Sequence, residues 1–76
     1  MFKVTIITSN NVLFEGDAAS IFLPGITGEF EVLELHNPII SLLKKGKIII
    51  DWKKRIPIKR GAVRMAADEL VAVVEE

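Results

Sequence analysis

The chain has 76 residues, with ten basic and ten acidic side chains, half of its residues hydrophobic and no cysteine. This length fits one domain, residues 1–76, with a small core. The lack of cysteine excludes a disulfide framework and a thiolate zinc site. No segment approaches the roughly 20 apolar residues of a membrane-crossing helix, so we expect the chain to reach a membrane only through a partner.

The charges are distributed unevenly along the sequence. Residues 1–38 hold one lysine against five acidic side chains, whereas residues 39–76 hold nine basic side chains against five acidic ones. Two interpretations are open. The halves form surfaces of opposite sign that orient a partner, or their strands interleave in the fold and cancel the asymmetry.

Short extended segments separated by turn residues occupy the first part of the chain. Phe2–Thr8 alternates apolar and polar residues with the period of a half-buried strand, and Ser9–Asn11 is typical of a turn. Val12–Glu15 and Ala18–Leu23 continue the pattern, and Pro24-Gly25 is a strong turn signal.

A hairpin is predicted in the second half of the chain. Lys47–Trp52 and Ile56–Lys59 form its strands, with a basic tip at Lys53–Arg55. Pro57 lacks the N–H that a sheet ladder needs, so its strand is expected at an edge or a bulge.

Two segments allow either a helix or a strand. Asn37–Gly46 has a possible N-cap, proline at the first helical position and lysines before a terminal glycine. Ala66–Glu76 is rich in helix formers, but its valines favour a strand, in which case Ala62–Met65 and Glu69–Val74 form a last pair. The rest of the pattern predicts a small all-β sandwich or barrel.

The strongest candidate for chemistry is the segment Gly28–Pro38, which contains the only histidine, His36, close to three glutamates. Carboxylates beside an imidazole suit general acid–base catalysis, but no motif brings a serine nucleophile to His36, and no phosphate loop or metal-ligand cluster is present. We therefore expect no catalytic residue, metal or cofactor, with His36 as an organiser of its loop. A small hydrolase is the least favoured function.

The basic region Lys44–Arg60 raises a different function, a β-module that binds single-stranded nucleic acid. Such modules place aromatic side chains among the cations. The four phenylalanines, Phe2, Phe14, Phe22 and Phe30, fall within apolar strands and are expected in the core, which leaves Trp52 as the one aromatic beside the basic tip.

Taken together, several segments resemble a known family. These are Leu23-Pro24-Gly25, Gly28-Glu29, and the stretch His36-Asn37-Pro38 through Lys44-Lys45-Gly46. In this order they resemble the Gly-Glu…Pro-x-His-Ala-Pro-Leu-Leu…Gly signature of the epsilon subunit of F-type ATP synthase, called delta in mitochondria. Leu70–Val74 stands where that family ends its N-terminal domain.

The resemblance implies a flattened β-sandwich of about ten short strands, with Ile39–Lys44 as a strand. It implies a non-catalytic central-stalk subunit without a cofactor. This subunit binds the gamma subunit through an apolar outer sheet face and docks on the loops of the membrane c-ring. It lies at the cytoplasmic face of a bacterial membrane, attached peripherally through the complex. The side chains expected to dock on the c-ring are Glu29, Glu31, Glu34 and His36.

The sequence also departs from the family pattern. Glu31, Glu34 and Asn37 stand where the family usually has glycine, proline and alanine. The family's second domain, a helical hairpin, has no counterpart in residues 1–76, so we expect either a naturally short subunit or a fragment, and in both cases no inhibition by that hairpin.

Overall fold

The structure, a computed structural model, describes residues 1–33 and 38–76. Within these residues the chain is all β, with nine strands and no helix. The strands are β1 (Phe2–Ile7), β2 (Val12–Ala18), β3 (Ser20–Gly25), β4 (Gly28–Leu33), β5 (Ile39–Leu43), β6 (Gly46–Ile50), β7 (Lys54–Ile58), β8 (Arg60–Ala66) and β9 (Glu69–Glu75). The predicted all-β fold is confirmed.

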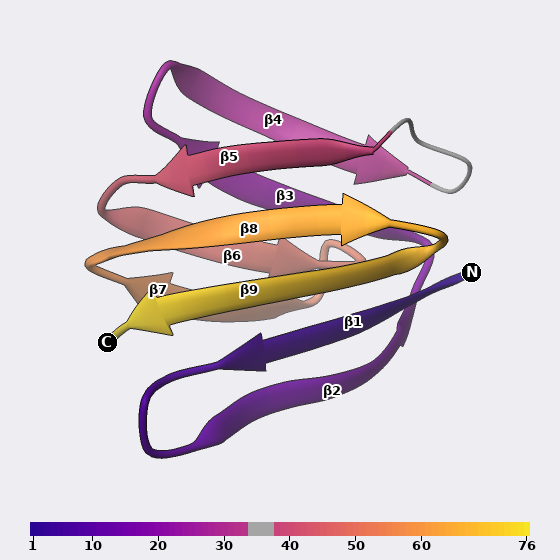
Figure 1. The fold of residues 1–76 in the computed structure, drawn as a ribbon, viewed down its shortest axis with the longest axis horizontal. Helices are drawn as coiled ribbons and strands as arrows, with labels where there is room; N and C mark the ends of the chain where they lie inside the picture. The colour runs from indigo at the N-terminus through magenta and orange to yellow at the C-terminus, as the bar shows by residue number, and fades with distance from the viewer. Residues whose placement is uncertain (34–37) are drawn as a thin grey trace.

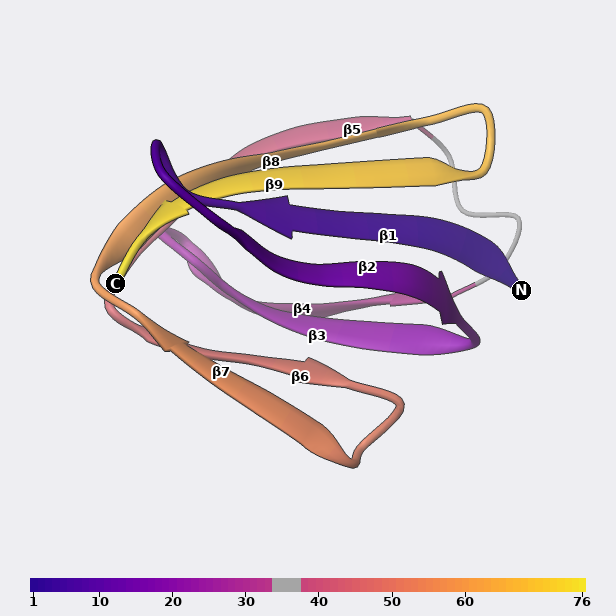
Figure 2. The ribbon, with the colours of Figure 1, turned by 90° about the horizontal axis from the view of Figure 1, so that it is seen from below.

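One curled sheet forms both layers of the sandwich (Figures 1 and 2). The strand order is β2-β1-β9-β8-β5-β3-β6-β7, and β4 pairs with the other side of β3. The first layer is β2-β1-β9-β8-β5 and the second is β4-β3-β6-β7. A single residue pair, Gly25 with Leu43, joins them between β3 and β5. The sheet therefore has two outward faces that point in opposite directions.

The core fills the space between the layers. Alternate residues of each strand point inward, among them Phe2, Val4 and Ile6 of β1 and Leu70 of β9, all at most 1% exposed. The alternation of Phe2–Thr8 is thus a true strand pattern, with Lys3 and Thr5 on the outer side. Phe14 and Phe30 pack against the core from partly buried positions.

Both segments that could be helix or strand are strands in the structure. β5 pairs with β8 from Ile39↔Met65 to Leu43↔Gly61, and β9 pairs with both β8 and β1. These pairings form hydrogen bonds with the backbone N–H and C=O groups that a helix would instead pair within itself. For β5, the strand is what the family resemblance implied.

Two predicted turns are wrong in position. Pro24 and Gly25 belong to β3, and the chain reverses at Ile26-Thr27. Proline is accommodated there because it has no N–H that needs an acceptor, while its carbonyl accepts the Lys44 N–H at 2.8 Å. The second hairpin turns at Asp51-Trp52, because both residues have positive φ (52° and 59°), so β6 ends at Ile50 rather than at Trp52. As predicted, Pro57 lies on an edge strand.

Candidate docking surfaces

The outer face of the first layer carries an unbroken apolar row across five strands. The sheet register places side by side one outward residue from each strand, Leu42 of β5, Ala62 of β8, Val73 of β9, Ile7 of β1 and Val12 of β2. Leu42 is 61% exposed, Val73 51% and Val12 62%. At about 4.8 Å between strands the row is roughly 19 Å long. A solvated sheet face would have polar residues at these positions.

A second row lies directly beside the apolar row. It joins Ile40, Arg64, Val71, Thr5 and Glu15, again one residue per strand. Ile40 is 82% exposed, and Val71 is half-buried. The apolar surface therefore widens at its β5 end, where Ile40 and Leu42 stand two residues apart on the same strand.

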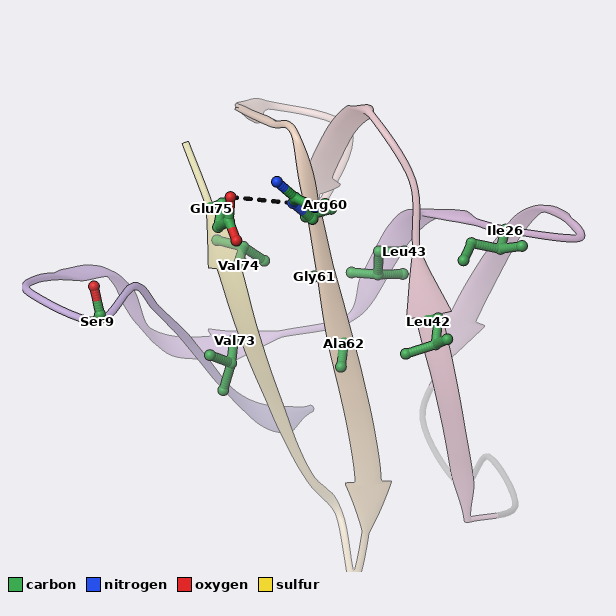
Figure 3. A pocket seen from close by; sticks show the side chains of 10 residues that line it. All are labelled: Ser9, Ile26, Leu42, Leu43, Arg60, Gly61, Ala62, Val73, Val74 and Glu75. Carbon is green, nitrogen blue, oxygen red and sulfur yellow. Dashed lines mark hydrogen bonds and ion pairs between the residues drawn. The ribbon is translucent and has the colours of Figure 1, made fainter.

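A shallow groove of about 620 Å³ lies at one end of the apolar row. Figure 3 shows Leu42, Ala62 and Val73 across three neighbouring strands at this groove. Its outer end is closed by an ion pair between Arg60 Nε and Glu75 Oε1, 3.1 Å apart and well exposed. Such a pair contributes little to folding stability, but each partner neutralises the other beside the groove.

The acidic residues predicted to dock lie on the opposite layer. Glu29 and Glu31 are both exposed and both point outward from β4, opposite Pro24 and Phe22 of β3. The structure thus brings these two carboxylates together on one edge strand. Glu34 and His36 lie outside the described residues.

Basic residues occupy the other edge of the same layer. The register runs from Glu31 through Phe22 and Ile49 to Arg55 of β7. Lys53 and Lys54 extend the positive charge around the hairpin turn, where all three cations are exposed. On the second layer, negative charge therefore lies at the β4 edge and positive charge at the β7 edge. On the first layer β9 lies beside β1, with β2 and β1 from the first half of the chain on one side and β9, β8 and β5 from the second half on the other.

One aromatic residue lies elsewhere than predicted. Phe22 is not in the core; it points outward from β3 and packs against Trp52, with ring centroids 5.7 Å apart. The cause is the inward orientation of its neighbours Ile21 and Leu23, which places Phe22 on the other side of the strand.

Sequence reasoning foresaw an exposed apolar sheet face but did not name its residues. The signal was present in Ile39–Leu43 and Leu70–Val74, which are apolar nearly throughout. A strand buried on one face alone would alternate with polar residues. Continuous apolar strands in a two-layer sandwich indicate a second covered face.

Comparison with known proteins gives the family. A family model described as "ATP synthase, Delta/Epsilon chain, beta-sandwich domain" matches residues 1–76. The chain belongs to this family. An ATP synthase epsilon chain of a Nitratiruptor species is 39% identical over 96% of this chain and 60% of its own length. That of Chlorobium limicola is 25% identical over 99% of this chain and 90% of its own length.

The structural comparison agrees on the fold. A chain of the "Tetrahymena thermophila mitochondrial ATP synthase - central stalk/cring" structure matches with a TM-score of 0.82 at 14% identity, over 97% of this chain and 63% of that one. The chain spans about three fifths of the length of the epsilon chains first matched, including those of Sulfurimonas denitrificans and a Sulfurovum species. In the described residues no helix is long and apolar enough to cross a membrane.

Proposed function

We propose that this epsilon-type sandwich is a non-catalytic rotor subunit of a bacterial F-type ATP synthase, linking gamma to the c-ring. It then couples ion flow to ATP synthesis mechanically, at the cytoplasmic face of the membrane and peripheral to it. The observation that carries the proposal is the apolar row from Val12 to Leu42. A rotor subunit needs a permanent attachment, and permanent interfaces are large and apolar.

The two outward faces suit two partners. A standard interface covers roughly 800 Å² per partner, so gamma bound on the apolar row would also cover the residues around it. Glu29 and Glu31, on the other layer, offer negative charge to basic loops of the c-ring. Because the faces point in opposite directions, one partner can bind without excluding the other.

Co-expression with the cognate gamma subunit followed by size-exclusion chromatography tests the proposal. The wild-type chain is expected to co-elute with gamma at micromolar concentration. Leu42→Lys places a charge within the apolar face and is expected to abolish co-elution, since the contact then buries an unpaired ammonium. Leu33→Lys is the matched control, because Leu33 is 51% exposed on the second layer.

Failure of the wild-type chain to co-elute with gamma would contradict the proposed rotor function. Equal loss of co-elution in both variants would instead mean a general loss of fold. The pairing of Phe22 with Trp52 beside Lys53 favours one other function, the binding of single-stranded nucleic acid. A salt-sensitive mobility shift with single-stranded RNA, lost in Trp52→Ala, would support that function instead.

A further inference from the structure

Arg64 is a cation set within the apolar part of the first layer. Its cross-strand neighbours are Ile40 on β5 and Val71 on β9. Along its own strand the next outward residues are Ala62 and Ala66. The positions directly across from Arg64 and next to it on its own strand are therefore apolar, and Glu69, the next outward residue of β9 after Val71, lies diagonally from it.

Within the described part of the chain, Arg64 has no ion pair or side-chain hydrogen bond. The contrast is Arg60, two outward positions along the same strand, which binds Glu75. Glu15 stands in the same row as Arg64 but three strands away, which is about 14 Å at the usual strand spacing. Arg64 is exposed, so its charge is open to solvent.

A partner that covers the apolar row must also cover Arg64. Arg64 lies two residues from Ala62, about 7 Å from the row. A contact of roughly 800 Å² centred on the row reaches about 14 Å to either side. The guanidinium thus falls inside the contact, away from its rim, and loses its contact with solvent. An unpaired charge at such a place opposes binding strongly.

We propose that the gamma subunit that binds this chain places a carboxylate against Arg64, and that this pair selects the correct partner and orientation. The inference rests on the proposed attachment of gamma to the first layer. Arginine suits the role because its planar fork binds a carboxylate through two parallel hydrogen bonds. Around the pair, the apolar row supplies contact area that does not require particular residues in gamma.

The decisive variant is Arg64→Met, which keeps much of the length of the side chain and removes its charge. If a carboxylate faces Arg64, this change leaves that carboxylate buried and unpaired, and the affinity for gamma is expected to fall about 30-fold or more. Arg64→Glu is expected to lower it at least about 100-fold. Without a carboxylate, Arg64→Met would instead bind as tightly as the wild type or more tightly. Arg55→Glu, on the second layer, is the control and should leave the affinity unchanged.

The measurement is isothermal titration calorimetry of each variant with gamma, with a urea midpoint for each to show that the fold is intact. Restored binding of Arg64→Glu by a single Asp→Lys or Glu→Lys change in gamma would identify the carboxylate. Wild-type affinity in Arg64→Met, with binding still lost in Leu42→Lys, would overturn this inference alone. Absence of wild-type binding would overturn the proposed function and this inference with it.

Discussion

Asp51 connects two hairpins through its side chain. Its carboxylate accepts the backbone N–H groups of Ala19 and Ser20 at 2.8 and 3.0 Å. Its own N–H donates to the Ser20 carbonyl at 2.9 Å. The residue sits at φ 52°, a conformation that aspartate tolerates better than most side chains. One residue thus sets both the turn between β6 and β7 and the start of β3.

We expect Asp51→Ala to lower the free energy of unfolding by about 2–3 kcal/mol, because two backbone donors, one of them in buried Ser20, lose a charged acceptor. Asp51→Asn keeps one acceptor and should lose about 1 kcal/mol. Asp68→Ala is the matched control, since Asp68 also has positive φ but its carboxylate accepts no hydrogen bond from the described residues. Urea unfolding measures all three. A loss in Asp68→Ala as large as that in Asp51→Ala would show that backbone conformation, and not the carboxylate, decides the effect.

Among the elements, the hairpin of β8 and β9 has a turn formed by residues that are unfavourable for its backbone geometry. Ala67 and Asp68 both have positive φ, 52° and 61°, and the flanking residues Ala66 and Glu69 pair directly. This is the geometry of a type I′ turn, which prefers Asn-Gly. The Asp68 carbonyl also accepts the Lys3 N–H at 2.9 Å, a bond that no change of side chain removes.

Replacing Ala67-Asp68 with Asn-Gly is expected to raise the free energy of unfolding by about 1 kcal/mol, since it relieves the strain of two left-handed residues. The same replacement at Lys44-Lys45, where neither residue has positive φ, should bring no gain. Thermal unfolding of both variants gives the comparison. Equal stabilisation at the two sites would refute the turn argument.

The elements also show where sequence reasoning succeeds. The alternation in β1, the hairpin of β6 and β7 and the edge position of Pro57 all follow from local patterns. Whether β5 is a helix or a strand could not be decided from residues 37–46 alone. Its proline and terminal lysines favour a helix. The strand forms because it pairs with β8, which is distant in the sequence. Local propensity has the weaker influence when a neighbouring strand provides hydrogen-bond partners for the backbone N–H and C=O groups.

At the scale of the whole molecule, the two layers carry different outward surfaces, the apolar row on one and Glu29 and Glu31 on the other. The apolar row cannot be read from the sequence as a surface, since its members come from five strands and meet only through the register. Glu29 and Glu31, in contrast, are two residues apart on one strand, so their common face follows from the period of a strand. Of the four predicted docking residues, these two are described.

We expect Glu29→Lys to weaken binding to the c-ring about 10-fold while the complex with gamma stays intact, because like charges then face each other across a polar contact. Asp17→Lys changes the net charge equally but lies on β2 of the first layer, and should leave c-ring binding unchanged. Binding of the gamma complex to c-ring vesicles at two salt concentrations checks this, since the attraction should weaken at the higher one. Loss of gamma binding in Glu29→Lys would point to misfolding.

The parallel pairing of β1 with β9 has a consequence for how the chain acquires its structure. Val4 pairs with Leu70, and β1 lies between β2 and β9, so β1 gains one of its two neighbours only after the seven strands β2–β8 and then β9 have been made. Pairings between such distant parts of a chain make folding slow, in the range of milliseconds to seconds. Until then the outward Ile7 and Val12 are close to the unpaired edge of β1, so the period before β9 pairs with β1 is when this chain is most prone to aggregate.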